Sequence, residues 1–184
     1  MKRRSLLTTG IVLAGAPVTA RAQPALDPEN TLYLDLKQGR VVIQLLPDVA
    51  PKTVAQIKTL TRQEFYDGTP FHRVMEGFMA QGGDPTGTGG GGSKLPNVPA
   101  EFSQRHFLRG TCGMARTQDP NSGNSQFFIM FAPGSFLDGQ YTIWGQVVKG
   151  MEFVDQIKRG VGQSGAVPGQ PDRIVQMRVA ADVK

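Results

Sequence analysis

The chain has 184 residues, of which 20 are lysine or arginine, 15 are aspartate or glutamate and 39% are hydrophobic, a size that suits one domain with its own core. Four of the basic residues and no acid lie in the first 22, so the remainder has a formal charge of +1, which gives no support to nucleic-acid binding. Cys112 is the only cysteine and there are two histidines, which excludes an intramolecular disulfide and a zinc cluster of soft ligands.

The first 22 residues have the pattern of an export signal. Lys2, Arg3 and Arg4 precede a mostly apolar stretch over residues 6–18, and Ala20-Arg21-Ala22 offers small residues where a signal peptidase reads. The apolar stretch is shorter than the roughly 20 residues that a membrane-spanning helix needs. We therefore expect cleavage before Gln23 and a periplasmic protein without a stable membrane anchor.

The export route stays open at this stage. Arg3-Arg4-Ser5-Leu6-Leu7 resembles a twin-arginine signal, but an ordinary secretory signal also carries paired basic residues. Residues 23–30, which contain Pro24 and Pro28, are expected to be a short leader before a single folded domain over residues 31–184.

A hairpin and a helix are predicted at the start of this domain. Residues 31–36 and 40–46 are rich in β-forming side chains and flank the turn sequence Lys37-Gln38-Gly39. Pro51 suits the first position of a helix, and the apolar residues that follow recur at a spacing of three, which predicts one buried face. We expect this helix to end near Gln63.

The remaining elements are short. We predict strands at residues 71–74, 78–81, 113–114, 126–130 and 142–148, a second helix at 151–158 and a closing strand at 174–180. Many short strands with two helices favour a mainly β barrel or sandwich with helical caps.

Two patterns suggest chemistry that the surrounding residues do not support. Residues 87–92 match GxGxxG, but no apolar strand leads into them and Pro96 and Pro99 interrupt any helix that could follow, so we expect a surface loop. No GxSxG elbow is present, and Cys112 has no base near it in the sequence, which argues against nucleophilic catalysis.

The most informative segment runs from Phe71 to Asp84. On a strand, Phe71, Arg73 and Met75 would share a face, while Phe78, Met79 and Gln81 follow closely. This indicates an apolar pocket with one cationic wall. By composition alone, a core strand with an arginine that extends to solvent is the stronger alternative.

This segment resembles the signature of the cyclophilins, in which FHR is followed by GFM-x-QGGD. Residues 110–130 (GTCGMARTQDPNSGNSQFFIM) resemble the second segment of that family, residues 136–139 (FLDG) and 144–147 (WGQV) resemble the third, and Pro51-Lys52-Thr53 opens the first helix in the same way. The resemblance covers about residues 30–182, and its motifs occur in the family's order.

The resemblance implies a closed antiparallel eight-stranded β-barrel capped by two α-helices. It also implies peptidyl-prolyl cis-trans isomerisation of proline-containing client polypeptides, without a metal or an organic cofactor, by a protein that we expect to be monomeric. The alternative is a chaperone or scaffold that binds proline-containing segments in the same groove without catalysis.

The family's functional positions match particular residues of this chain. The catalytic positions correspond to Arg73 and Gln81. The substrate-binding positions correspond to His72, Phe78, Met79, Ala115, Arg116, Gln126, Phe128, Phe136, Leu137 and Tyr141.

Three of these positions depart from well-known eukaryotic cyclophilins. Arg116 stands where they carry asparagine, Phe136 replaces a tryptophan at the pocket rim, and Tyr141 replaces a histidine at the groove edge. Because an indole N–H donor is lost at the rim, we expect isomerase activity to survive and binding of cyclosporin-type cyclic peptides to weaken.

Overall fold

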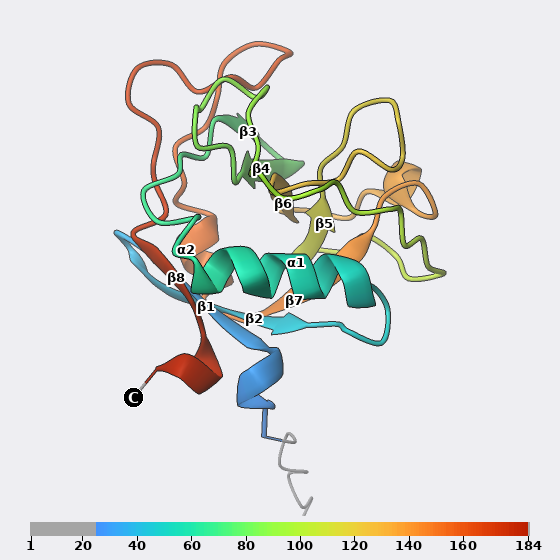
Figure 1. Ribbon diagram of the computed structural model, residues 1–184. Helices are drawn as coiled ribbons and strands as arrows, with labels where there is room; N and C mark the ends of the chain where they lie inside the picture. The colour runs from blue at the N-terminus through green and yellow to red at the C-terminus, as the bar shows by residue number, and fades with distance from the viewer. Residues whose placement is uncertain (1–24, 184) are drawn as a thin grey trace, which may run out of the picture.

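The computed structural model describes residues 25–183, in which eight strands form one antiparallel sheet (Figure 1). The hydrogen-bonded order is β3-β4-β6-β5-β7-β2-β1-β8. The strands are β1 (Thr31–Leu36), β2 (Gly39–Leu45), β3 (Arg73–Met75), β4 (Met79–Gly82), β5 (Thr111–Met114), β6 (Phe127–Met130), β7 (Ile143–Lys149) and β8 (Gln176–Val179). The predicted signal peptide and its cleavage point lie outside the described residues. Within residues 25–183, no helix has the length and apolar character to cross a bilayer.

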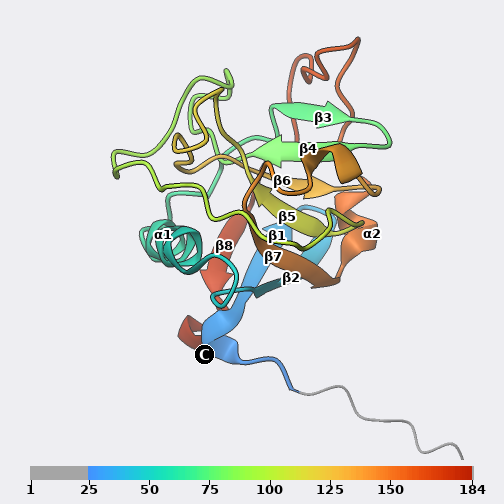
Figure 2. The same ribbon diagram turned by 90° about the vertical axis from the view of Figure 1, so that its right-hand side faces the viewer.

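The sheet curls into a half-barrel and does not close (Figure 2). β3 and β8 are its two ends, and they do not pair with each other. Isolated bridges such as the one between Pro70 and Arg173 join the two end regions instead. Pro168 and Pro171 precede β8, and a residue without an N–H group interrupts a regular ladder of hydrogen bonds. The eight antiparallel strands are confirmed, whereas the closed barrel is wrong.

Helix α1 (Pro51–Arg62) packs beside β8 and buries the apolar face that the spacing of its residues predicts. Its first N–H groups have no partner inside the helix, as in any helix. Here the carboxylate of Glu101 accepts hydrogen bonds from Lys52 N (2.9 Å) and Thr53 N (2.8 Å). A negative charge at this end also interacts favourably with the helix dipole. A distant loop therefore completes the start of α1.

Helix α2 (Met151–Val154) is a single turn and is shorter than the predicted 151–158. The N–H groups of Gln156 and Ile157 bond to carbonyls three residues back, which is 3₁₀ rather than α geometry. The ring of Phe153 lies against Gly39 in the β1–β2 hairpin, where an added Cβ would come within 2.6 Å of the ring. Gly39 thus permits the close approach of α2 to the hairpin.

Both ends of the described chain are joined through Arg62 at the end of α1. Its Nη2 lies 2.9 Å from Glu29 Oε2 in the short 3₁₀ helix η1 (Pro28–Asn30). Its Nε lies 2.9 Å from Asp182 Oδ2 in a second 3₁₀ helix, η3 (Ala180–Asp182). Figure 1 shows these ends together, on the opposite side of the molecule from β3 and β4.

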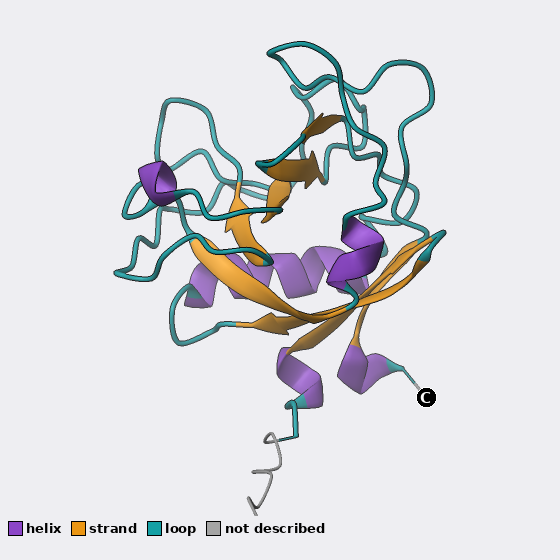
Figure 3. Ribbon diagram, turned by 180° about the vertical axis from the view of Figure 1, so that it is seen from behind, coloured by secondary structure: helices purple, strands orange, loops and turns teal. Residues whose placement is uncertain are grey.

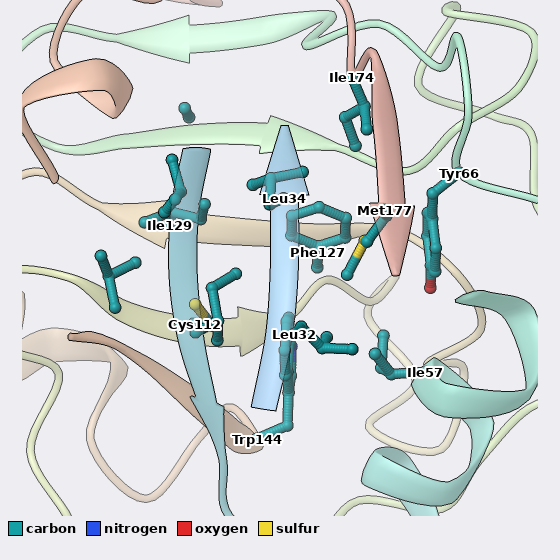
Figure 4. Packing of buried hydrophobic residues seen from close by; sticks show 14 of the residues in the cluster. Leu32, Leu34, Ile57, Tyr66, Cys112, Phe127, Ile129, Trp144, Ile174 and Met177 are labelled. Carbon is teal, nitrogen blue, oxygen red and sulfur yellow. The ribbon is translucent and has the colours of Figure 1, made fainter. Parts of the chain in front are cut away.

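Strand β6 distributes its side chains between two buried clusters. Phe127 and Ile129 enter the large core, together with residues of β1, α1 and β7 (Figure 4). Phe128 and Met130, on the other face of the strand, enter a smaller cluster that also contains Met79, Phe107, Leu137 and Ile143. Met79 of this smaller cluster belongs to β4, which lies next to the end strand β3. Long loops surround the short strands at this end of the sheet (Figure 3). The smaller cluster forms the base of the site described next.

Candidate active site

The register of four neighbouring strands places the main site residues in one row. Arg73 on β3 is opposite Gln81 on β4, Gln81 is opposite Phe128 on β6, and Phe128 is opposite Gly113 on β5. Residues that are opposite each other in a sheet project from the same face. The cationic, amide and aromatic side chains are therefore brought side by side, although 55 residues separate Arg73 from Phe128 in the chain.

This face lines a cavity of about 400 Å³. The volume lies within the range typical of small-ligand sites. The lining residues are Arg73, Phe78, Met79, Gln81, Ala115, Arg116, Phe128, Phe136, Leu137, Gln140 and Tyr141. Apolar side chains form most of this lining, and its formal charges are both positive.

Aromatic packing fixes the shape of the apolar part. The Phe128 ring stacks on Phe107 with centroids 5.7 Å apart, and Tyr141 meets Phe128 edge to face at 5.9 Å. An added Cβ at Gly113 would lie only 2.3 Å from Phe128 Cζ, so the absence of a side chain there leaves room for the ring. The cavity keeps its base because Phe128 is held from behind as well as from the side.

Arg73 is held by three hydrogen bonds that leave part of its guanidinium free. Nε donates to Ser164 O (3.0 Å), Nη1 to Gln81 Oε1 (3.2 Å) and Nη2 to the Met75 sulfur (3.0 Å). Each Nη carries two N–H groups, so one on each remains available to a ligand. No carboxylate within residues 25–183 forms an ion pair with Arg73. The geometry thus presents an oriented cation at the edge of an apolar cavity.

A second amide continues this network away from the cavity. Gln81 Nε2 donates to Gln126 Oε1 (3.0 Å), and Gln126 Nε2 donates to the carbonyl oxygens of Gly89 (2.9 Å) and Gly91 (2.8 Å). These bonds also fix which end of each amide is oxygen and which is nitrogen. The glycine-rich loop over residues 84–93 is consequently linked to Arg73 through two side chains.

The loop is organised around the buried carboxylate of Asp84. That carboxylate accepts hydrogen bonds from the backbone N–H groups of Thr86 (2.8 Å), Gly89 (2.7 Å) and Gly91 (3.1 Å). Burial acts to raise the pKa of Asp84, but the hydrogen bonds from Thr86, Gly91 and Gly89 outweigh it and lower the pKa. The N–H groups that a phosphate-binding loop would turn outward point inward here. The surface-loop interpretation of the GxGxxG pattern is therefore confirmed.

The lone cysteine and the metal-ligand types do not form a second reactive centre. Cys112 is fully buried on β5, and burial raises the pKa of its thiol, so it is neither ionised nor accessible at neutral pH. Across residues 25–183, no three His, Cys, Asp or Glu side chains gather as metal ligands would.

Comparison with known proteins identifies the family. The family model for the cyclophilin type peptidyl-prolyl cis-trans isomerases matches residues 31–179, which is most of the chain. The chain belongs to the cyclophilin family. A protein of Brucella suis named as a probable peptidyl-prolyl cis-trans isomerase is 49% identical over 192 aligned positions, which cover 98% of each chain. The human peptidyl-prolyl cis-trans isomerase-like 1 is 40% identical over 134 positions, covering 71% of this chain and 80% of the human one.

Solved structures agree with this assignment. The cyclophilin AquaCyp293 from Hirschia baltica superimposes with a TM-score of 0.77 at 31% identity, over 86% of this chain and 77% of its own. A Cryptosporidium parvum cyclophilin, crystallised in the presence of the dipeptide Ala-Pro, gives a TM-score of 0.73 at 27% identity, over 81% and 98%. The protein is a cyclophilin-type peptidyl-prolyl cis-trans isomerase.

The structure of this cyclophilin gathers ten of the twelve site residues predicted from the sequence around the cavity. Gln126 lines a neighbouring cavity and reaches the first one through Gln81. His72 lines neither cavity; it lies beside Gly89, and its Nδ1 is buried without a hydrogen-bond partner. Burial lowers the pKa of its imidazole, so His72 is neutral at pH 7. It directly precedes the first residue of β3, and adjacent residues of a strand face opposite ways.

Three contacts of the cyclophilin site were missed in the sequence. Gln140 lines the cavity, the carbonyl of Ser164 accepts from Arg73, and the sulfur of Met75 is a further acceptor. The sequence did offer an indication for Met75, because strand alternation places it on the same face as Arg73. No local pattern pointed to Ser164, because it belongs to a loop 91 residues further along the chain.

Proposed function

We propose that this isomerase acts on exported polypeptides and that Arg73 supplies the hydrogen-bond donor that lowers the barrier to rotation of the X–Pro bond. The observation that carries the proposal is the cationic side chain at the edge of an aromatic cavity, with donors still available. In this assignment the cavity takes the proline ring, and Gln81 orients the guanidinium.

The reaction needs stabilisation of a twisted amide and nothing more. A planar peptide bond has partial double-bond character, and its rotation barrier is about 18–20 kcal/mol. An uncatalysed X–Pro bond therefore takes roughly tens to hundreds of seconds to isomerise. No covalent bond is broken, so only interactions stronger with the twisted state than with either planar state accelerate the exchange.

Twisting changes the prolyl nitrogen into a better hydrogen-bond acceptor. In the planar amide its lone pair is delocalised, and in the twisted amide the lone pair is localised on a pyramidal nitrogen. A charged donor aimed at this atom therefore forms its strongest hydrogen bond in the twisted transition state. The aromatic walls hold the ring still while the residue before proline rotates.

The test is proline-peptide isomerisation by wild type, Arg73→Ala and Arg73→Lys. We expect the alanine variant to lose at least about a hundredfold in kcat/KM, by analogy with the deletion of an oxyanion-hole donor. The lysine variant should recover only part of this, because a point charge lacks the planar fork of donors. Arg105→Ala is the matched control, since Arg105 is exposed and does not line the cavity.

Two outcomes would overturn the assignment. Turnover by Arg73→Ala equal to that of wild type would exclude Arg73 as the donor. Negligible turnover by wild type, combined with peptide binding that Arg73→Ala leaves unchanged, would favour the non-catalytic binding module.

The location of the activity needs a separate experiment. The proposed periplasmic location is supported by the basic, apolar and small-residue order of residues 1–22. We expect the mature protein in the periplasmic fraction to begin at Gln23, as read by N-terminal sequencing of fractionated cells. A chain that kept Met1 and stayed in the cytoplasm would contradict export.

A further inference from the structure

A second cavity adjoins the first at its polar end. It has a volume of about 350 Å³ and shares Gln81, Ala115 and Arg116 with the first cavity. The rest of its lining is neutral and polar, from Gly89, Gly90, Gly91, Gly92, Ser93, Asn97, Thr117, Ser122, Asn124 and Gln126. A peptide whose proline fills the first cavity can therefore continue past Arg116 into the second.

Arg116 dominates the charge of this path. It is the only charged residue in the lining of the second cavity, and with Arg73 it is one of two in both linings together. Neither lining contains an acid. Among residues 25–183, none of the ion pairs involves Arg116. The combined cleft is therefore positive.

Two acids in the loops beside the cavities accept hydrogen bonds from backbone N–H groups. The carboxylate of Asp119 accepts from Asn121 N (2.8 Å), and Asp84 is fully buried beneath the amides of its own loop. Neither one forms an ion pair with Arg116.

The guanidinium of Arg116 is fixed before any ligand arrives. Nε and Nη2 both donate to Gln140 O (3.2 and 3.0 Å), and Nη1 donates to Thr117 O (2.9 Å). The group also lies over the Tyr141 ring, 4.4 Å from its centroid. Backbone carbonyls orient the charge without cancelling it. A charge held in this way loses little further conformational freedom on pairing with a ligand.

We propose that Arg116 makes this isomerase selective for proline segments that carry an aspartate or glutamate within about three residues of the proline. An extended peptide advances about 3.3–3.6 Å per residue, so three residues span roughly 10 Å. The two cavities share Gln81, Ala115 and Arg116 in their linings, so this span is matched to a proline in the first cavity and an acidic side chain in the second. The proposal rests on the first cavity being the proline site. It adds to the proposed function a preferred class of substrate, namely proline segments with an acidic residue nearby.

The test compares peptides that differ only in Glu against Gln, at two or three positions before the proline and, in a second series, after it. We expect wild type to favour glutamate roughly three- to fivefold in kcat/KM in one of the two series, which is the size of a partly exposed ion pair. The preference should shrink when the salt concentration rises from about 20 to about 500 mM, because salt screens such pairs.

Three variants distinguish an effect of the charge at Arg116 from an effect of the net charge of the whole protein. Arg116→Gln should reduce the Glu-to-Gln ratio to about one, and Arg116→Lys should keep most of it. Arg105→Gln removes the same net charge from a residue that lines neither cavity, and it should keep the wild-type ratio. Because ratios are compared, a general loss of activity in a variant does not obscure the result.

Equal use of both peptides by wild type in both series would overturn the acidic selectivity and leave the proposed function intact. A preference that persists in Arg116→Gln would overturn the role of Arg116. Absence of all turnover would instead count against the proposed function. In that case, fluorescence anisotropy with fluorescently labelled forms of the same peptides measures the Glu-to-Gln preference in binding. Equal affinities for the Glu and Gln peptides would overturn the selectivity.

Discussion

Gln81 and Gln126 are joined by a side-chain hydrogen bond of 3.0 Å, and this bond links the Arg73 guanidinium to a loop that does not line the first cavity. Each amide uses its oxygen on one side and its nitrogen on the other. The orientation of Arg73 therefore depends on the carbonyls of Gly89 and Gly91 as well as on its own contacts.

Replacing Gln126 by leucine should lower turnover without unfolding the protein. Gln81 loses its acceptor and is free to rotate, so Arg73 spends less time in the productive orientation. We expect kcat to fall about tenfold with little change in the melting temperature. Gln126→Glu keeps an oxygen that accepts from Gln81 but loses the N–H groups that donate to the loop. Its kcat should therefore lie between those of wild type and Gln126→Leu. A fall in melting temperature that matches the fall in turnover would mean that Gln126 has only a structural role.

Replacing Gly113 by alanine should displace the Phe128 ring, which forms the base of the cavity. The new methyl group would meet Phe128 Cζ at 2.3 Å, so the ring must move toward the cavity or the strands must separate. We expect a loss of about 1–3 kcal/mol in the free energy of unfolding, together with weaker peptide binding.

Phe128→Leu in the same chain tests whether that clash is the cause. The shorter side chain removes the clashing carbon, so the double variant should be more stable than the sum of the two single changes predicts. Additive losses, measured by urea unfolding, would show that the strain of Gly113→Ala lies elsewhere.

Asp84 should make the stability of the protein depend on pH in acid. Its pKa is lowered on folding, so its contribution is complete above the unfolded value of about 3.9 and is lost as the pH falls through the lower folded value. At pH 7, Asp84→Asn should cost about 1–3 kcal/mol, because its new NH₂ group faces the amides of the loop.

The difference between wild type and Asp84→Asn should therefore narrow as the pH falls below about 4. Other acids with lowered pKa values are present in both proteins and cancel from this difference. Asp48→Asn is the matched control, since Asp48 is exposed. Urea unfolding at pH 7 and at about pH 3.5 measures both effects. If the difference in unfolding free energy between wild type and Asp84→Asn stays constant with pH, the cost of the substitution comes from packing rather than from the lost charge.

Phe136→Trp should strengthen the binding of cyclosporin. Phe136 is 64% exposed at the rim of the cavity and lies against Phe78 at a centroid distance of 5.3 Å, so a larger ring can be accommodated. The added indole N–H can donate one hydrogen bond, which is worth about 0.5–1.5 kcal/mol, or up to roughly tenfold in affinity. Leu108→Trp, at another exposed position, is the control for added aromatic surface. Equal affinities of wild type and Phe136→Trp in calorimetry would contradict a donor role at this position.

Local patterns were sufficient for the elements that are local in character. The first hairpin and α1 occur where the strand alternation, the turn residues and the spacing of three place them. The second helix is shorter than predicted, since 3₁₀ bonding replaces α bonding after Asp155 and no breaker residue marks that change. The closed barrel failed because closure depends on how residues near Pro70 and Arg173 meet, and no strand pattern governs irregular segments.

The composition of the site was more predictable than its arrangement. The motifs identified the cationic, amide and aromatic residues that line the cavity. The row from Arg73 to Gly113 depends on strand order and register, which join segments distant in the chain. His72 lines neither cavity, because its neighbour Arg73 faces the first cavity and adjacent residues of a strand point to opposite sides.

Arg62 binds the first and last turns of the described chain together, on the side of the molecule remote from β3 and β4. A linker attached near either end would therefore emerge away from the face that carries the proposed proline site. Immobilised on a bead or a sensor chip through such a linker, the enzyme should remain accessible to proteins much larger than test peptides.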